Sequence, residues 1–201
     1  MENRVPRYGI RPNPMGDWPE IDSTAFVDPS AQIIGNVQIG PNVFVGPQVV
    51  IRADEPDPDG RVHPIVVGAE TNLQDGVIIH SRGGTSVIIG PEISIAHGVV
   101  IHGPCDIGRG CFLSLRSVFY RAILEEDVWV GIGAIVMKAT IPSHTMIPAG
   151  SLIRSKTDVR HFRLVNIKEE EYQKGVAEAS RAFRQGYLDL YEKDSPAGDN
   201  D

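Results

Sequence analysis

Cysteine is scarce in this chain of 201 residues, which contains only Cys105 and Cys111. The two form neither a CxxC pair nor a disulfide framework, and we expect them to be small buried thiols. Long apolar runs are also lacking. No stretch of about 18 apolar residues is present, so we expect no transmembrane helix. The first residues, MENRVPRYGIRPNP, have no apolar core of the kind that a secretory signal needs, and a cytoplasmic location is the default expectation.

Basic residues are in the minority, with 19 Lys and Arg against 26 Asp and Glu and a net charge of −7. An acidic chain of this kind argues against a nucleic acid or an anionic membrane as partner. Glycine and proline, in contrast, are abundant, with 21 and 15 residues. This composition favours many turns over long helices.

An aliphatic residue recurs at every sixth position along most of the chain. This period fits neither a helix nor a hairpin and is the hexapeptide signature of a β-helix, in which three hexads form one triangular coil. The hexapeptide form resembles the left-handed parallel β-helix, with the aliphatic residue inside the prism and coils about 4.8 Å apart. The positions in register are Val27, Ile33, Ile39, Val45 and Ile51; Val67, Leu73 and Ile79; Ile89, Ile95, Ile101, Ile107, Leu113 and Phe119; Leu124, Val130 and Val136; and Ile141, Ile147 and Ile153.

The repeat divides the chain into four parts. We expect an all-β fold, a left-handed parallel β-helix over 23–155, preceded by an N-terminal arm over 1–22 and followed by a C-terminal helix region over 156–193 and a disordered tail over 194–201. Two turn-rich segments interrupt the period, EPDPDGRVH (55–63) and SRGGTS (81–86). We expect both to project from corners of the prism.

A helix is expected over 167–192, packed along the outside of the prism. Its first turns contain KEEE, and acidic residues there suit the positive end of a helix dipole. The spacing of the apolar residues predicts one stripe that faces the prism. The stripe consists of Val176, Ala179, Phe183, Tyr187 and Leu190.

Counting hexads places two histidines side by side. If the two loops leave the count unchanged, the residues that follow Ile51, Ile79, Ile101 and Phe119 form one outward-facing column. This column consists of Arg52, His80, His102 and Tyr120. Two imidazoles one coil apart can share a metal ion.

His97 lies on another face, near Asp75 in the preceding coil. It can meet His80 and His102 only if a second prism docks against the first, and cyclic symmetry closes such a head-to-tail contact as a ring, most naturally a trimer. Three histidines with an open fourth position are typical of catalytic zinc, which lowers the pKa of its bound water to about 7. The other three histidines, His63, His144 and His161, are expected to be solvated turn residues.

The segments around the three histidines resemble one family. QDGVIIH (74–80) and SIAHGVVIHGP (94–104) look like the metal-binding segments of the gamma-class carbonic anhydrases. IRADE (51–55), NLQDG (72–76) and IPAG (147–150) match further segments of that family. The resemblance extends from about residue 11 to residue 155.

The resemblance implies an enzyme, a lyase that reversibly hydrates carbon dioxide to bicarbonate with a metal-bound hydroxide at the interface of a homotrimer. The metal would be zinc, or iron or cobalt. The ligands would be His80 and His102 of one subunit and His97 of its neighbour.

Five further residues receive roles from the same resemblance. Arg52 and Asp75 match the interface ion pair of the family, and Gln74 matches the glutamine that holds the metal-bound water. Glu55 matches an acidic residue of proton transfer, and Asn72 matches a polar neighbour of the site. Three of these assignments also have a structural interpretation: Arg52 and Asp75 as a pair that only stabilises the trimer, Gln74 as a surface amide, and Glu55 as a solvated carboxylate.

The chain departs from the family in two places. Only SRGGT follows His80, where some members have a long acidic loop with a glutamate that shuttles protons, so that shuttle is absent. Some members also place an aromatic residue and an asparagine from the C-terminal helix over the site, and the helix residues around Glu178 and Ser180 do not obviously supply them. Two alternatives stay open: a hexapeptide acyltransferase that uses coenzyme A, and a catalytically silent scaffold or complex subunit.

Overall fold

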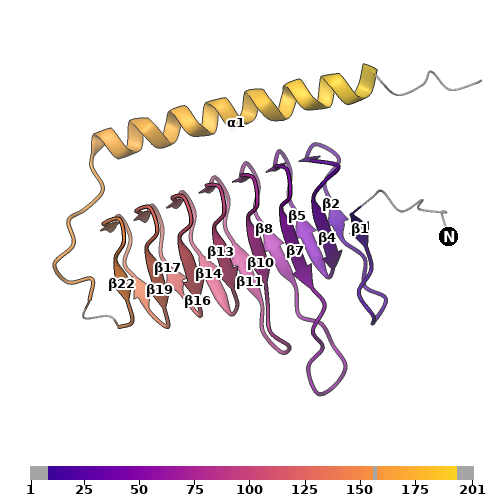
Figure 1. The fold of residues 1–201 in the computed structure, drawn as a ribbon, viewed down its shortest axis with the longest axis horizontal. Helices are drawn as coiled ribbons and strands as arrows, with labels where there is room; N and C mark the ends of the chain where they lie inside the picture. Colours follow the sequence, from indigo (N-terminus) through magenta and orange to yellow (C-terminus); the bar gives the residue numbers. More distant parts are fainter. Residues whose placement is uncertain (1–8, 156–157, 194–201) are drawn as a thin grey trace, which may run out of the picture.

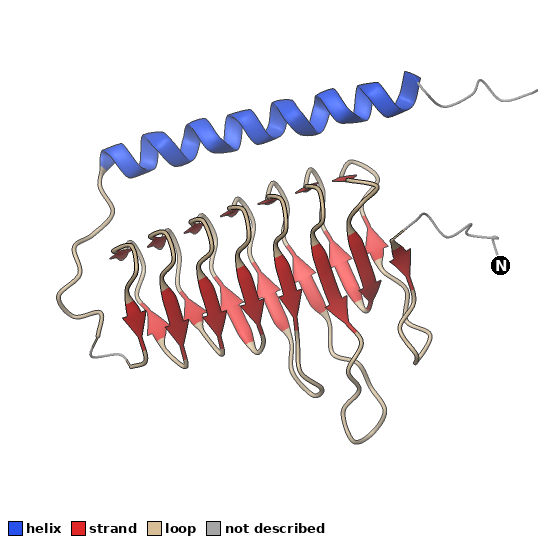
Figure 2. Ribbon diagram, viewed as in Figure 1, coloured by secondary structure: helices blue, strands red, loops and turns tan. Residues whose placement is uncertain are grey.

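The computed structural model describes residues 9–155 and 158–193, which form a parallel β-helix with one long helix beside it (Figure 1). Each coil contributes one short strand to each of three sheets, so the three sheets form the faces of a triangular prism (Figure 2). The left-handed β-helix that the period of six predicts is confirmed.

All strand pairs within the three sheets are parallel. The first sheet consists of β1 (Ile10–Arg11), β4 (Gln32–Gly35), β7 (Val50–Ala53), β10 (Ile78–His80), β13 (Val100–His102), β16 (Val118–Tyr120), β19 (Ile135–Met137) and β22 (Leu152–Ile153). The second sheet consists of β2 (Glu20–Ile21), β5 (Val37–Ile39), β8 (Ile65–Val67), β11 (Val87–Ile89), β14 (Cys105–Ile107), β17 (Ile123–Leu124) and β20 (Thr140–Ile141). The third sheet consists of β3 (Phe26–Val27), β6 (Phe44–Val45), β9 (Asn72–Leu73), β12 (Ser94–Ile95), β15 (Phe112–Leu113), β18 (Trp129–Val130) and β21 (Met146–Ile147).

The core is a set of stacked aliphatic side chains inside the prism. Ile79 pairs in register with Ile51 in the coil before it and with Ile101 in the coil after it, and all three are completely buried. Because each buried CH₂ group contributes about 0.8 kcal/mol, such stacks hold successive coils together. The loops at 55–63 and 81–86 leave this register unchanged, and both project from the prism (Figure 1).

Strand pairing begins earlier than residue 23. β1 pairs with β4 and β2 pairs with β5, because Ile10 and Ile21 supply apolar side chains that pack partly buried against the core. The expected tail at 194–201 lies outside the described residues.

The predicted helix is confirmed as α1 (Ile167–Lys193). Its start is capped: the Asn166 side chain accepts a hydrogen bond from the Lys168 N–H, and Glu169 Oε2 accepts one from the Asn166 N–H, both at 2.9 Å. This reciprocal arrangement satisfies two N–H groups that lack a partner within the helix.

Helix α1 runs along the outside of the third sheet (Figure 1). Aromatic side chains mediate the contact. Tyr187 stacks on Phe26 with ring centroids 5.0 Å apart, and Tyr172 packs edge-on against Phe112 and Trp129, which stack on each other at 4.1 Å. The predicted apolar stripe is only partly buried, because Phe183 and Leu190 are 57% and 50% exposed.

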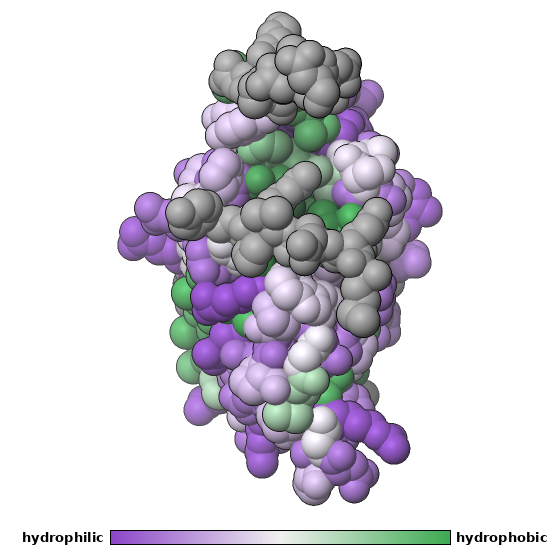
Figure 3. Space-filling view, turned by 90° about the vertical axis from the view of Figure 1, so that its right-hand side faces the viewer, coloured by the Kyte–Doolittle hydropathy of each residue, from purple (hydrophilic) through white to green (hydrophobic). Residues whose placement is uncertain are grey.

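Seen from the N-terminal side, the surface is largely hydrophilic, with apolar residues gathered in separate patches (Figure 3). Among the described residues, no helix combines the length and the apolar character needed to cross a membrane. Both cysteines are buried free thiols, and burial raises the pKa of Cys111 to about 12.

Candidate metal centre

Two imidazoles stand side by side on the outer face of the first sheet. The parallel register of β10 and β13 places His80 opposite His102, with ring centroids 5.2 Å apart. The same column continues to Arg52 in β7 on one side and to Tyr120 in β16 on the other. The spacing follows from the β-helix itself, because outward residues at equivalent positions of neighbouring coils are separated by one strand spacing.

Three charged side chains converge on the Nε2 atom of His80. Arg52 Nη2 donates a hydrogen bond to it at 3.2 Å, and carboxylate oxygens of Asp54 and Glu55 lie 3.5 and 3.4 Å away. Arginine has no acceptor, so this contact leaves the lone pair on Nε2 and the proton on Nδ1. Burial, and after it the Arg52 guanidinium, lower the pKa of His80 below its ordinary value. A neutral imidazole, the form that ligates metals, is therefore favoured.

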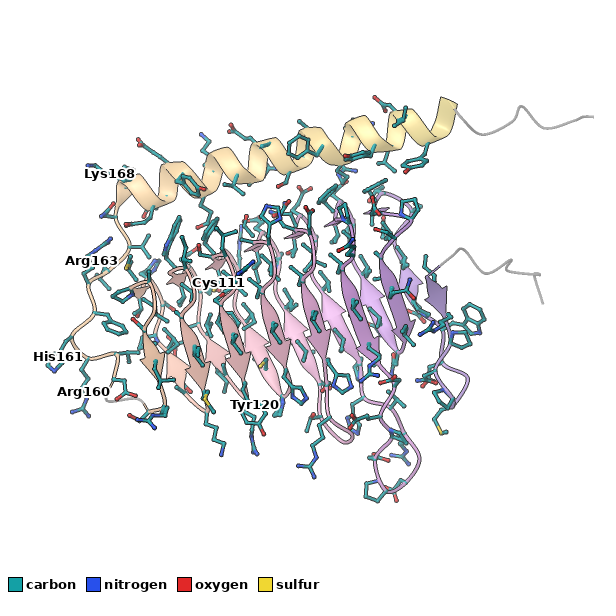
Figure 4. All side chains as sticks on the ribbon, in the orientation of Figure 1. Cys111, Tyr120, Arg160, His161, Arg163 and Lys168 are labelled. Atoms are coloured by element: carbon teal, nitrogen blue, oxygen red, sulfur yellow. The ribbon has the colours of Figure 1, made fainter. Side chains whose placement is uncertain are left out.

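His102 is oriented by the backbone. Its Nδ1 lies 3.2 Å from the carbonyl oxygen of Gly103, and donation to that oxygen leaves the Nε2 lone pair free. The ring of Tyr120 packs beside it, with centroids 5.6 Å apart, and Tyr120 lies at the edge of the prism away from α1 (Figure 4). Metal-ligating histidines commonly donate their second ring N–H in this way, which fixes the orientation of the ring.

His97 lies at a corner of the prism, where the chain turns from the third sheet into the first. It lies two residues after the end of β12 and stands in the same coil as His102. Its Nδ1 is 3.6 Å from Asp75 Oδ2 of the preceding turn, and both side chains are more than half exposed. Within one copy of the described chain, no three His, Cys, Asp or Glu side chains come together as metal ligands.

Asn72 lies in β9 of the third sheet, and Gln74 directly follows that strand, both under the helix. Gln74 Nε2 donates to Asn72 Oδ1 at 3.0 Å and to the hydroxyl of Ser180 at 3.3 Å, and Asn72 Nδ2 donates to Ser94 at 2.9 Å. Ser180 is a buried residue of α1. The helix thus contributes a serine hydroxyl to this region, because the turn of helix at Ser180 lies directly against Gln74.

Arg52 and Asp75 are not paired within one copy. Arg52 Nε lies 3.4 Å from Asp54 Oδ1, whereas Asp75 faces His97. Asp54 was not singled out in the sequence, although it stands between two residues of the IRADE segment that were. Its Oδ1 atom is buried and, among the described residues, has no hydrogen-bond partner.

Comparison with known proteins identifies the family of the chain. A model of bacterial transferase hexapeptide repeats matches residues 19–53. A carbonic anhydrase of Methanosarcina thermophila is 32% identical over 174 residues, which cover 74% of this chain and 68% of the relative. The chain belongs to the gamma-class carbonic anhydrase family.

Other members of this group are longer than the chain. A mitochondrial gamma carbonic anhydrase 2 of Arabidopsis thaliana is 30% identical over 160 residues, 79% of this chain and 51% of the relative. The carboxysome assembly protein CcmM of a Nostoc species is 32% identical over 179 residues, 84% of this chain. The chain spans about a third of the CcmM protein (31%) and about half of the plant protein.

Among solved structures, a hexapeptide transferase family protein from Anaplasma phagocytophilum superposes with a TM-score of 0.75 at 28% identity. The match covers 90% of this chain and 99% of that one. This likeness supports the fold over nearly the whole chain.

Proposed function

We propose that this protein catalyses the reversible hydration of carbon dioxide to bicarbonate at a metal centre formed between two copies of the chain. The observation that carries the proposal is the pair His80 and His102, side by side on an open face, together with His97 in the same coil at a corner. A corner of one copy seated on the first sheet of the next would bring the three imidazoles together.

The donor set fits a transition metal such as zinc, iron or cobalt. His80 is favoured as a neutral imidazole, and the Gly103 carbonyl orients His102 with Nε2 free. Nitrogen donors of this kind suit zinc and its neighbours in the first transition row. Beside them, Asp54 Oδ1 is a buried acceptor 3.4 Å from the Arg52 guanidinium and without a hydrogen bond among the described residues, and it would accept one from that guanidinium or from a water at a completed site.

The surfaces that would meet in a trimer are apolar where they flank the histidines. A ladder of aliphatic side chains runs along the outer face of the first sheet beside the histidine column. It consists of Val50, Ile78, Val100, Val118, Ile135 and Leu152. At the corner that bears His97, Leu115 and Ile132 are 38% and 54% exposed in the two following coils. We infer that, in a closed ring of three copies, the ladder of one copy packs against the His97 corner of the next and both become buried.

When bound, the metal supplies a Lewis acid that activates water at neutral pH. The residues of the chain then have separate tasks. Asn72 and Ser180 hold the Gln74 amide in place, and Gln74 orients the reacting molecules through its remaining polar atoms. Glu55, which contacts His80, accepts the proton that water loses. Arg52, which donates to His80 within one copy, would pair with Asp75 of the partner subunit, and the Nε2 lone pair of His80 would then be available to hold the metal.

A second function is favoured by one of the comparisons. The similarity to a carboxysome assembly protein supports a role as an assembly module in which the trimer is structural. Such a module would form the same trimer and bind metal at the same histidines without hydrating carbon dioxide.

Metal content and carbon dioxide hydration, measured on the same purified sample, test the proposal. We expect one metal ion per chain and measurable hydration in the wild-type protein, with both lost in His97→Ala. Ala96→Ser, in the same turn, serves as the control and should keep both. Bound metal without hydration would support the assembly module, and absence of metal from the wild-type protein would contradict the metal centre.

A further inference from the structure

The loop at 55–63 is a short antiparallel hairpin rather than an irregular turn. Pro56 and Val62 form an antiparallel bridge, and the Asp57 N–H donates to the Arg61 carbonyl oxygen at 2.8 Å. On the side of the bridge nearer the prism, the next pair of opposite residues is therefore Glu55 and His63. Residues directly opposite each other in such a pair lie about 5 Å apart and point to the same face.

Side chains at alternate positions share that face, so Asp57 and Arg61 lie on it with Glu55 and His63. His63 Nε2 is 3.1 Å from Asp57 Oδ2. Asp57 is held firmly, since its Oδ1 accepts hydrogen bonds from the N–H groups of Asp59 and Arg61, both at 2.9 Å. The N–H of Arg61 is the main cause of the lowered pKa of Asp57, and His63 adds to it. His63 is thus an anchored imidazole that is 40% exposed, not a free turn residue.

The base of the hairpin touches the candidate metal centre. Glu55 Oε1 lies 3.4 Å from His80 Nε2, and Glu55 Oε2 accepts a hydrogen bond from the Gly83 N–H at 3.2 Å. The second loop packs so closely here that a Cβ atom at Gly83 would collide with the carbonyl oxygen of Pro56. The two loops therefore support each other, and the hairpin has a defined position next to His80.

We propose that His63, held by Asp57, exports the proton of the reaction from the metal centre to buffer. This inference rests on the proposed function. The hairpin face leads from the contact with His80 at its base, across Glu55, to the exposed imidazole of His63. His63 takes up one proton that leaves the centre, becomes an imidazolium stabilised by the Asp57 carboxylate, and gives the proton to a buffer base, which restores the neutral imidazole.

This assignment supplies a function that the short loop after His80 does not provide. A histidine exchanges protons readily near neutral pH, because its ordinary pKa lies within about one unit of 7. General acid–base groups must also reach both donor and acceptor, and His63 has the site on one side and solvent on the other. Arg61 is the one Lys or Arg residue of the 55–63 hairpin, and it lies on the same face as His63.

Oxygen-18 exchange between labelled bicarbonate and water, followed by mass spectrometry, separates two rates on the metal-loaded protein. One is the interconversion of carbon dioxide and bicarbonate, and the other is the release of labelled water, which needs a proton. We expect His63→Ala to lower the rate of water release about tenfold and to change interconversion much less. Imidazole added to the medium should restore water release.

His144→Ala is the matched control, because His144 is also an exposed histidine beside an aspartate, with Nδ1 3.7 Å from Asp127 Oδ2, in a distant corner. Both rates should stay at the wild-type value in this variant.

A second readout does not depend on the metal. In the metal-free protein, Glu55→Gln should shift the NMR resonances of the His63 ring, whereas Glu92→Gln should not.

Unchanged water release in His63→Ala, with interconversion intact, would overturn the role of His63 and leave the proposed function standing. An unchanged His63 resonance in Glu55→Gln would overturn the arrangement of the hairpin face. Absence of interconversion in the wild-type protein would instead overturn the proposed function, and the export role with it.

Discussion

The first and the third sheet are built from the same repeat, yet their outer faces differ. The third sheet has aromatic side chains, and the chain covers them itself with α1. The first sheet has an aliphatic ladder and a histidine column, and α1 does not pack over them. One face is covered within a single copy, and we propose that a second copy covers the other.

The two outer faces also differ in what they contribute: we assign the third sheet mainly to stability and the first sheet to the proposed metal centre. Contacts between α1 and the third sheet stabilise the single copy, and the hydrogen bond from Gln74 to Ser180 holds the Gln74 side chain in place. On the first sheet, the exposed fractions of Ile78 and Leu152 are 45% and 51%, and both residues lie in the same face as the two histidines. Three predictions test this comparison, from the largest expected effect to the smallest.

The first prediction concerns the ladder. Ile135→Asp places a charge in the middle of the apolar face, two coils away from His102, and burying that charge unpaired is strongly unfavourable. We expect the trimer to dissociate and hydration to fall at least about a hundredfold, because each site needs two copies. Sedimentation velocity and a hydration assay measure the two effects.

Ile88→Asp is the control for this variant. Ile88 is also an exposed isoleucine, but it lies on the second sheet, for which we propose no partner. The Ile88→Asp protein should therefore remain trimeric and active. A trimer that survives Ile135→Asp would show that the ladder is not the interface.

The second prediction concerns the aromatic contact. Trp129→Ala removes the ring that stacks on Phe112 and meets Tyr172, and we expect the free energy of unfolding to fall by about 3 kcal/mol. Denaturant unfolding monitored by circular dichroism gives this value. Leu190→Ala changes a half-exposed residue of α1, the helix that contains Tyr172, and should change stability by less than about 0.5 kcal/mol. Equal losses in both variants would contradict a contact made chiefly by the aromatic side chains.

The third prediction is the smallest. Ser180→Ala removes one hydrogen bond to Gln74, and we expect a loss of about 1 kcal/mol in stability. Hydration should fall several-fold while the metal content stays unchanged, since Gln74 loses one of its two described partners. Hydration equal to that of the wild-type protein would place Gln74 outside the reaction.

Much of the fold is predictable because the repeat is strict. A period of six residues determines both the strand positions and the stacking of coils, so the neighbours His80 and His102 follow from counting alone. The start of the helix is also readable, since Asn166 and Glu169 form a local capping pattern.

The residues that the sequence analysis missed or undervalued lie where the period stops. The pairing of His63 with Asp57 and the contact between Glu55 and Gly83 depend on how two loops fold against each other. The hydrogen bond from Gln74 to Ser180 joins residues 106 positions apart. No repeat relates these positions, so only the folded chain brings them together.

The central claim, a metal centre shared between two copies, is tested most directly by mixing two inactive variants. His97→Ala and His102→Ala chains, unfolded, mixed in equal amounts and refolded together, should regain about a quarter of the wild-type hydration, because about one interface in four then combines an intact His102 with an intact His97. Each variant refolded alone should stay inactive. Recovery would establish that the three histidines come from two subunits. Failure of the mixture to regain activity, with mixed trimers shown to form, would contradict the shared site.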